Sequence, residues 1–202
     1  DIMMPDGDGF HFLSEMRERQ IEVPVIMTTG YSTLDNAVDS LYKGAIDFVP
    51  KPFTADELLS SVSRGMKYAE IQRAMKNTSR NGEDIALMYV PCPSTYFRLG
   101  YITWLSLEHS GAVAVGVTDL FLKTINTLET IEIQKANHEV EQGNVCALIH
   151  SENSVVHPIL SPISGRIVEA HEEVSANAAI IEKDPYFKGW VYRIIPSDLE
   201  YE

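Results

Sequence analysis

The chain has 202 residues, enough for one large domain or two ordinary ones, and its 45% hydrophobic content is that of a globular protein. Its 29 acidic and 16 basic residues give a net charge of −13, which argues against nucleic acid as a partner because phosphate binding needs clustered Lys and Arg. No apolar run approaches the roughly 18 residues of a membrane helix, and no signal peptide is evident, so we expect a cytoplasmic protein without a membrane partner.

The first third of the chain alternates predicted strands and helices, which is typical of a parallel α/β sheet. A start rich in Gly, Asp and Pro favours a loop, two short apolar runs favour buried strands, and residues 54–57 form a capping box that opens a long helix. In chain order we expect a loop over 1–9, a helix over 10–20, a strand over 23–28, a helix from Ser32 or Thr33 to Lys43, a strand over 45–49, and a helix from Thr54 with Leu58, Leu59, Val62 and Met66 facing inward.

Two parallel strands cannot bury both faces of a sheet or protect its edges, so we expect further strands and helices ahead of Asp1. The last helix stays apolar as far as Met75, and a polar stretch follows it. This boundary predicts an α/β domain over 1–76, a linker over 77–95 and a second domain over 96–202. A helix that outlasts its domain could be a rigid arm, a contact in a homodimer, or only a longer terminal helix.

Four motifs of the first domain follow one another along the chain. They are Asp1-Ile-Met-Met-Pro5 with Gly9, Pro24-Val-Ile-Met-Thr-Thr29, Gly44-Ala45 and Lys51-Pro-Phe53. Over residues 1–72 the chain therefore resembles the second half of a two-component response-regulator receiver domain. The resemblance implies a flavodoxin-like, doubly wound parallel sheet and a sensor histidine kinase as partner.

The same resemblance implies roles for individual residues. Asp1 would be the phosphorylated aspartate, Thr29 would follow the acyl phosphate, Lys51 would pair with the phosphoryl oxygens, and Phe48 would be the aromatic switch. A carboxylate can accept a phosphoryl group when Mg²⁺ and a lysine offset the developing charge. The carbonyl of Met3 would contribute to the Mg²⁺ site. The two acidic ligands of that site lie on a strand that this sequence lacks, so we expect the chain alone to autophosphorylate poorly.

From about Ile85 the chain changes to short β-branched runs separated by turns, which predicts an all-β sandwich or flattened barrel. Thr118 can cap one short helix. Cys92 and Cys146 lack the spacing of a metal or redox pair, so we interpret them as buried free thiols. We expect strands over 101–107, 112–117, 127–133, 145–150, 155–160, 165–170 and 189–195.

The fourth and fifth of these strands form a candidate hairpin around a polar tip, and three further motifs accompany it. They are Gly116-Val-Thr-Asp119, Ser161-Pro-Ile-Ser-Gly165 and Asp184-Pro-Tyr-Phe-Lys-Gly-Trp190. Over 96–198 this pattern resembles the glycine cleavage system H protein, which implies a lipoyl-domain-like fold. In that family the hairpin tip carries a lipoylated lysine, and the matching residue here is Ser154. A lipoyl amide needs the amine of lysine, and no lysine occurs between Lys135 and Lys183, so no lipoate is expected.

The histidines of the hairpin suggest a second kind of chemistry. A two-residue turn at Asn153-Ser154 would place His150 opposite His157 and Glu152 opposite Val155. Such a histidine pair could bind a transition metal or titrate near neutral pH, and two ordinary exposed histidines are the alternative. The tip serine has no orienting partner for nucleophilic catalysis, so we expect no enzymatic activity.

These patterns predict a response regulator in phosphorelay signalling, whose non-lipoylated β-domain is an output module that binds an unknown protein. The alternative is a lipoyl or acyl carrier of a glycine-cleavage-like complex that is regulated by the receiver domain. Such a carrier would have to use a lysine outside the motif, namely Lys123, Lys135, Lys183 or Lys188. A scaffold that responds to metal or pH through the two histidines is the third possibility.

Overall fold

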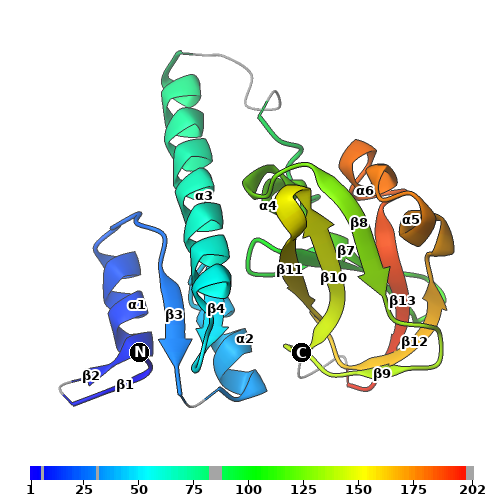
Figure 1. Ribbon diagram of the computed structural model, residues 1–202, viewed down its shortest axis with the longest axis horizontal. Coiled ribbons are helices and arrows are strands. Elements are labelled where there is room, and N and C mark those ends of the chain that lie inside the picture. The colour runs from blue at the N-terminus through cyan, green and yellow to red at the C-terminus, as the bar shows by residue number, and fades with distance from the viewer. Residues whose placement is uncertain (6, 31, 82–87, 199–202) are drawn as a thin grey trace. The chain divides into compact units, whose positions relative to one another are not determined.

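The computed structural model describes residues 1–5, 7–30, 32–81 and 88–198. The chain divides into two compact units, Asp1–Met88 and Tyr89–Glu202, and Figure 1 shows the first as α/β and the second as mainly β. Both expected fold classes, a parallel α/β unit and an all-β sandwich, are confirmed. Part of the expected linker, and the expected change of pattern near Ile85, lie outside the described residues.

The first unit is built on a two-stranded parallel sheet in which Met27 lies beside Phe48. Its helices begin where polar side chains accept hydrogen bonds from free backbone N–H groups: Thr33 from Asn36, and Thr54 from Glu57 in the predicted capping box. The elements are β1 (Met3–Met4), β2 (Gly7–Asp8), α1 (Gly9–Glu18), β3 (Ile26–Thr29), α2 (Leu34–Tyr42), β4 (Asp47–Pro50) and α3 (Ala55–Asn81). Residues 77–81, expected to begin the linker, are thus helical.

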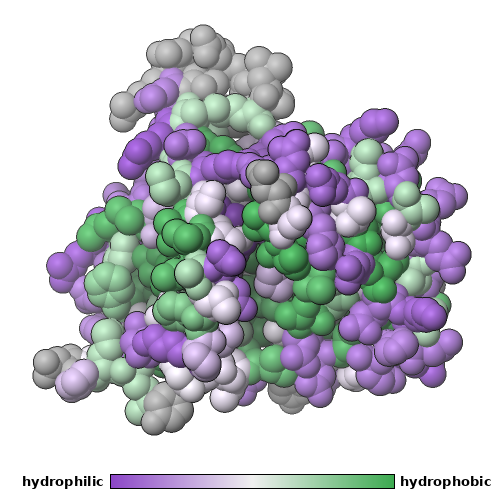
Figure 2. All heavy atoms as spheres, viewed as in Figure 1, coloured by the Kyte–Doolittle hydropathy of each residue, from purple (hydrophilic) through white to green (hydrophobic). Residues whose placement is uncertain are grey.

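The inward face of α3 differs from the expected one. Leu59, Val62 and Met66, which were expected to face inward, are 63%, 39% and 62% exposed. Figure 2 shows hydrophobic atoms at the surface over the region that α3 occupies in Figure 1. The side that α3 buries instead carries Ser61 and Arg64, which bond to a carboxylate on β4. The prediction was wrong because it ranked residues by hydrophobicity and could not foresee a buried polar partner.

The second unit is a sandwich of two antiparallel sheets with strand orders β5-β6-β7-β13-β12-β9 and β11-β10-β8. All the expected strands are present, and Thr118 caps α4 as predicted. The elements are β5 (Phe97–Leu99), β6 (Thr103–Leu107), β7 (Val113–Val117), α4 (Asp119–Thr124), β8 (Leu128–Ile133), β9 (Glu139–Val140), β10 (Val145–Ser151), η2 (Glu152–Ser154), β11 (Val155–Leu160), β12 (Gly165–Ala170), α5 (Glu172–Ala176), α6 (Ala179–Lys183) and β13 (Trp190–Pro196).

Trp104 on β6 joins the large sheet to the loop that precedes β13. Its side chain is buried, and its Nε1–H lies 3.1 Å from both the Val117 carbonyl and the Pro185 carbonyl. Gly116, opposite Trp104 on β7, leaves room for the indole ring. A Cβ atom at Gly116 would lie 2.4 Å from Cζ2 of that ring. The indole therefore fills the space that a side chain at residue 116 would need.

We expect Gly116→Ala to lower the free energy of unfolding of the second unit by about 1–3 kcal/mol, the usual cost of adding a methyl group to a filled core. Trp104 is held by two hydrogen bonds and cannot move away freely. Chemical denaturation followed by tryptophan fluorescence measures this cost. Gly111→Ala in the turn after β6 is an unsuitable control because its φ is +84°, whereas His109→Ala truncates an exposed side chain of the same turn. An unchanged transition in Gly116→Ala would contradict the packing described above.

Candidate functional site

The carboxylate of Asp1 lies next to the amine of Lys51. Oδ2 of Asp1 is 2.9 Å from Nζ of Lys51, and Oδ1 accepts a hydrogen bond of 2.8 Å from the backbone N–H of Ile2. The two side chains are 36% and 42% exposed. The first unit thus presents an accessible carboxylate with a fixed cation beside it, and two predicted site residues are in contact.

Thr29 and Lys51 meet at the same end of the parallel sheet. Thr29 ends β3 and is fully buried, and its carbonyl accepts a 2.8 Å hydrogen bond from the backbone N–H of Lys51. Because both strands run in the same direction, the residues that follow them lie at one edge of the sheet. This hydrogen bond therefore connects Thr29, which is expected to follow the acyl phosphate, to Lys51, which is expected to pair with the phosphoryl oxygens.

Gly9 is required by the close approach of two backbone segments. Its N–H donates to the Ile2 carbonyl at 2.8 Å. A Cβ atom at this residue would lie 2.3 Å from the carbonyl oxygen of Asp1. A glycine here therefore lets α1 begin directly against the backbone that carries the candidate acceptor.

Phe48, the expected aromatic switch, is half-buried against the core of the first unit. That core consists of Ile2, Leu13, Met27 and Ala45. The backbone N–H of Phe48 lies 2.9 Å from Oδ1 of Asp47, the residue before it. Phe48 therefore packs against the core to which Ile2, the residue after Asp1, also belongs. Among the contacts of the described residues, none joins the Phe48 side chain to the Asp1 carboxylate.

Sequence reasoning missed a buried polar cluster of Asp47, Ser61 and Arg64, which begins at the opposite end of β4 from Lys51. Oδ2 of Asp47 accepts a hydrogen bond of 2.6 Å from Ser61 and forms an ion pair with Arg64. All three residues are buried. Two features of the sequence could have revealed this cluster: an aspartate in an otherwise apolar strand, and a serine and an arginine three residues apart on one side of a helix.

The described residues supply only part of a magnesium site. Mg²⁺ takes six oxygen ligands, usually including one or two carboxylates. Here one carboxylate, that of Asp1, stands at the candidate site, and Met3 is exposed on the neighbouring strand β1. No group of three His, Cys, Asp or Glu side chains that could hold a metal ion occurs within the described residues. Asp1 and Met3 therefore do not form a magnesium site by themselves.

Ser154 lies at the tip of the hairpin between β10 and β11. The tip is a single turn of 3-10 helix, η2, and Ser154 closes it with a φ of +58° and an exposed side chain. A positive φ is uncommon for a residue with a Cβ and occurs here because the chain must reverse direction within three residues. The hydroxyl at the tip is thus presented to solvent on a defined backbone.

The predicted pairing of the two hairpin histidines is wrong. The three-residue tip places Ser151 opposite Val155, so His150 lies opposite Val156. His157 then pairs with Ile149, and a shift of one residue moves a side chain to the other face of a strand. The two histidines therefore face opposite sides of the sheet and cannot hold one metal ion together.

Each histidine instead has its own partner. Nε2 of His150 lies 3.0 Å from a carboxylate oxygen of Glu132 on β8. His157 is buried, with Nε2 2.9 Å from Oγ of Ser151 and its ring edge-on to Phe121. The Ser151–His157 bond was not predicted, because the register that creates it depends on the length of the tip. It crosses the hairpin directly below the tip and fastens the two arms together.

The comparisons with known proteins identify both units. Residues 96–202, more than half of the chain, match the glycine cleavage H-protein family. The chain belongs to this family. Residues 1–63 match the response regulator receiver domain, so the first unit is a receiver domain and the second an H-protein domain.

Individual relatives match one unit each. The glycine cleavage system H protein of Halorhodospira halophila is 30% identical over 95 residues, which cover 47% of this chain and 72% of that protein. The probable H protein of Pyrococcus horikoshii is 33% identical over 99 residues, covering 49% and 72%. The DNA-binding transcriptional regulator NtrC of Escherichia coli K12 is 39% identical over 82 residues. The 82 matched residues make up 41% of this chain, and this chain spans only 18% of that regulator's length.

A solved structure also resembles the second unit. The crystal structure of a glycine cleavage system H protein from Mycobacterium marinum matches 52% of this chain and 87% of that protein, with 24% identity and a TM-score of 0.49.

Among the helices that the structure describes, none has the length and apolarity needed to cross a membrane.

The chemistry available at the two candidate sites differs. The receiver domain holds a carboxylate that can act as a nucleophile toward phosphorus, with a lysine placed to offset negative charge. The H-protein domain holds at its tip a hydroxyl, which cannot form the amide that links lipoate to lysine. The first site thus presents a carboxylate, and the tip of the hairpin presents a hydroxyl.

Proposed function

We propose that this chain is a response regulator in phosphorelay signalling, phosphorylated on Asp1 by a sensor histidine kinase. In this proposal the H-protein domain carries no lipoate and is an output module that binds another protein. The contact between the exposed carboxylate of Asp1 and the amine of Lys51 carries the first part. A serine at the tip of an intact hairpin supports the second.

Phosphorylation would change the charge at one edge of the receiver sheet. The phosphoryl group replaces a single negative charge with about two and adds three acceptor oxygens. Lys51 already contacts the carboxylate and would pair with one of these oxygens, and Thr29 would follow when its buried hydroxyl turns outward. Phe48, half-buried against the segment after Asp1, would then repack. A small local event could in this way shift the receiver between two arrangements.

The H-protein domain has the features of a binding module. Its hairpin is held on one side by β8 and across its arms by the Ser151–His157 bond, so the tip keeps a defined shape. Val156, beside the tip, is an exposed apolar residue that a partner could cover. The proposal predicts that the set of bound partners differs between the unaltered protein and its Asp1→Asn variant. Identical partners for both would count heavily against it.

We expect excess acetyl phosphate with Mg²⁺ to add one phosphoryl group slowly to the unaltered protein and none to Asp1→Asn. The carboxylate oxygen of Asp1 attacks phosphorus, the bond between phosphorus and the acetate oxygen breaks, and acetate leaves. Lys51→Ala should slow the reaction by on the order of 10²-fold, as the loss of one charge-stabilising donor typically does. Intact-mass spectrometry measures the product.

Asp8→Asn is the matched control for this experiment. Asp8 is another exposed carboxylate near the start of the chain, but it caps α1 by accepting a 2.8 Å hydrogen bond from Phe10. This variant should be phosphorylated like the unaltered protein. Equal phosphorylation of Asp1→Asn and the unaltered protein would show that the acceptor is another residue.

A further inference from the structure

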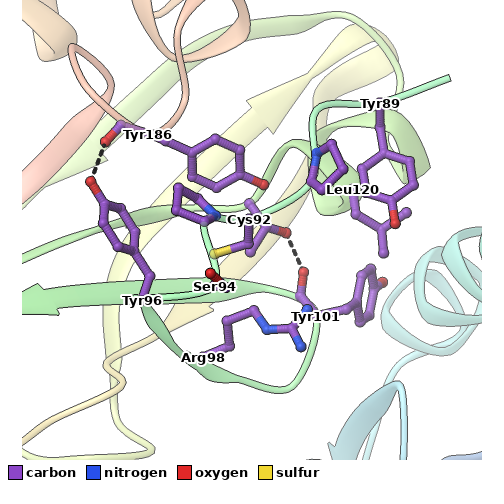
Figure 3. Close-up of a pocket in the computed structure, with 11 residues that line it drawn as sticks. Tyr89, Cys92, Ser94, Tyr96, Arg98, Tyr101, Leu120 and Tyr186 are labelled. Atoms are coloured by element: carbon purple, nitrogen blue, oxygen red, sulfur yellow. Dashed lines mark hydrogen bonds between the residues drawn. The ribbon is translucent and has the colours of Figure 1, made fainter. Parts of the chain in front are cut away.

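A cavity of about 310 Å³ lies entirely within the H-protein domain (Figure 3). Its volume is at the lower end of the range found for small-molecule sites. Its walls come from the segment that leads into β5, from β5 itself, from the start of α4 and from the loop before β13. The residues that matter for its chemistry are Tyr89, Cys92, Tyr96, Arg98, Tyr101 and Tyr186.

Hydrogen bonds between distant parts of the chain hold this cavity in shape. The hydroxyl of Tyr186 donates to the Val90 carbonyl at 3.0 Å and accepts from the backbone N–H of Asp119 at 3.1 Å. The carboxylate of Asp119 in turn accepts a 2.6 Å bond from the backbone N–H of Val90. Tyr96 donates to the Tyr186 carbonyl at 3.3 Å, as Figure 3 shows. A cavity whose walls are fixed in advance loses little entropy when a ligand binds.

Arg98 on β5 brings a positive charge to the lining of the cavity, and the residue is exposed to solvent. In Figure 3 its side chain extends along the cavity toward Tyr101. Although the sequence has 29 acidic residues, the guanidinium of Arg98 forms no ion pair or hydrogen bond with another described residue. Its charge reaches the thiol of Cys92: burial raises the pKa of this thiol, and Arg98 acts in the opposite direction. The guanidinium and the thiol therefore both line the cavity, close enough for the charge of Arg98 to act on Cys92.

We propose that this cavity binds a small monocarboxylate with an apolar body. The carboxylate would accept paired hydrogen bonds from the planar guanidinium of Arg98, a geometry that this group is shaped to make. The apolar body would lie against the tyrosine rings and against Pro91 and Pro93. A single guanidinium matches one negative charge, and a protein with a net charge of −13 disfavours an anion with more. The site is independent of the phosphoacceptor and of the hairpin.

Cys92 allows a direct test, because a carboxylate reagent can be delivered to it. Iodoacetate carries the proposed recognition group, and iodoacetamide is its neutral analogue. In both reactions the thiolate sulfur forms a bond to the CH₂ carbon and iodide leaves. Cys146 does not interfere, since it is buried and its pKa is raised to about 12 by burial.

We expect the ratio of the iodoacetate rate to the iodoacetamide rate at Cys92 to fall on the order of tenfold in Arg98→Gln, which loses a charge-assisted bidentate contact. The variant also changes the thiolate fraction of Cys92, but this affects both reagents equally and cancels in the ratio. Arg98→Lys, which keeps the charge and loses the planar fork, should give an intermediate ratio. Mass spectrometry of the alkylated peptide gives each rate.

Competition distinguishes the ligand class. Benzoate should protect Cys92 from iodoacetamide in the unaltered full chain and not in Arg98→Gln, whereas benzamide should protect neither. An unchanged alkylation ratio in Arg98→Gln, or no protection by benzoate, would overturn the proposal. Protection by inorganic phosphate as strong as that by benzoate would also overturn the assignment to a monocarboxylate.

Discussion

Replacing Ser154 with lysine is expected to produce a protein that is lipoylated at this residue, whereas the unaltered protein remains without a lipoyl group. The exposed tip, the paired arms and the surrounding sandwich are all in place, and the missing part is the amine that forms the amide. The change supplies that amine at the hairpin tip, where we expect the attachment position of this family. The effect is all or none, because no lysine lies between Lys135 and Lys183 in the unaltered chain.

The backbone at the tip can accept this substitution. The φ of +58° at Ser154 is a left-handed conformation that costs a residue with a Cβ roughly 1–2 kcal/mol. Serine already bears this cost, so lysine adds little to it. The side chain at this residue is exposed, and a longer chain meets solvent rather than the core. Ser154→Lys should therefore fold like the unaltered protein.

Co-expression with a lipoate ligase and supply of lipoate, followed by intact-mass and peptide mass spectrometry, measures the modification. Val156→Lys is the matched control: Val156 is 42% exposed and two residues away, but it lies on the arm β11 and not at the tip. It should remain unmodified. Folded Ser154→Lys without any lipoyl group would show that the tip has lost more than its lysine. A lipoyl group on the unaltered protein would favour the carrier alternative.

Asp47→Ala is expected to lower the free energy of unfolding of the receiver domain by about 3–5 kcal/mol. The substitution removes one partner of a buried ion pair and leaves the guanidinium of Arg64 without its carboxylate. It also removes the 2.6 Å hydrogen bond from Ser61. A loss of this size is a large fraction of the stability of an ordinary domain. Replacing both members of the pair, as in Asp47→Leu with Arg64→Met, should cost much less, because no buried charge remains.

The positions of the two tryptophans allow the unfolding of the two domains to be followed separately. Trp104 and Trp190, the two in the sequence, both lie in the H-protein domain, so their fluorescence reports that domain alone. Far-ultraviolet circular dichroism follows the receiver domain, whose α3 is the longest helix described. Asp39→Ala, which breaks an exposed 3.3 Å pair with Lys43, is the control and should cost less than about 1 kcal/mol. Equal losses in the Asp39 and Asp47 variants would contradict the importance of burial.

Local signals in the sequence predicted most of the secondary structure because each acts over a few residues. Thr33, Thr54 and Thr118 cap helices where expected, and each β-branched run became a strand. Resemblance to a family predicted that Lys51 pairs with phosphoryl oxygens on Asp1, and the structure places the Lys51 amine 2.9 Å from the Asp1 carboxylate. Whether these residues perform the expected roles stays a prediction.

Two features could not be predicted because they depend on partners far away in the sequence. The side of α3 that is buried is set by the carboxylate of Asp47, whose distance from Arg64 no helical pattern reveals. The placement of His150 and His157 depends on whether the hairpin tip has two residues or three. A difference of one residue in a turn reverses the face of every side chain on an arm.

The bonds around Val90 have a mechanical consequence. The chain enters the H-protein domain at Tyr89, and the next residue is held through its N–H by Asp119 and through its carbonyl by Tyr186. Tension applied to the chain ahead of this residue therefore passes first to the start of α4 and to the loop before β13, and not to the strands. Asp119 and Tyr186 belong to the Gly116–Asp119 and Asp184–Trp190 motifs, so a pull on the chain ahead of Val90 would strain these two motif residues before it strained the sheets.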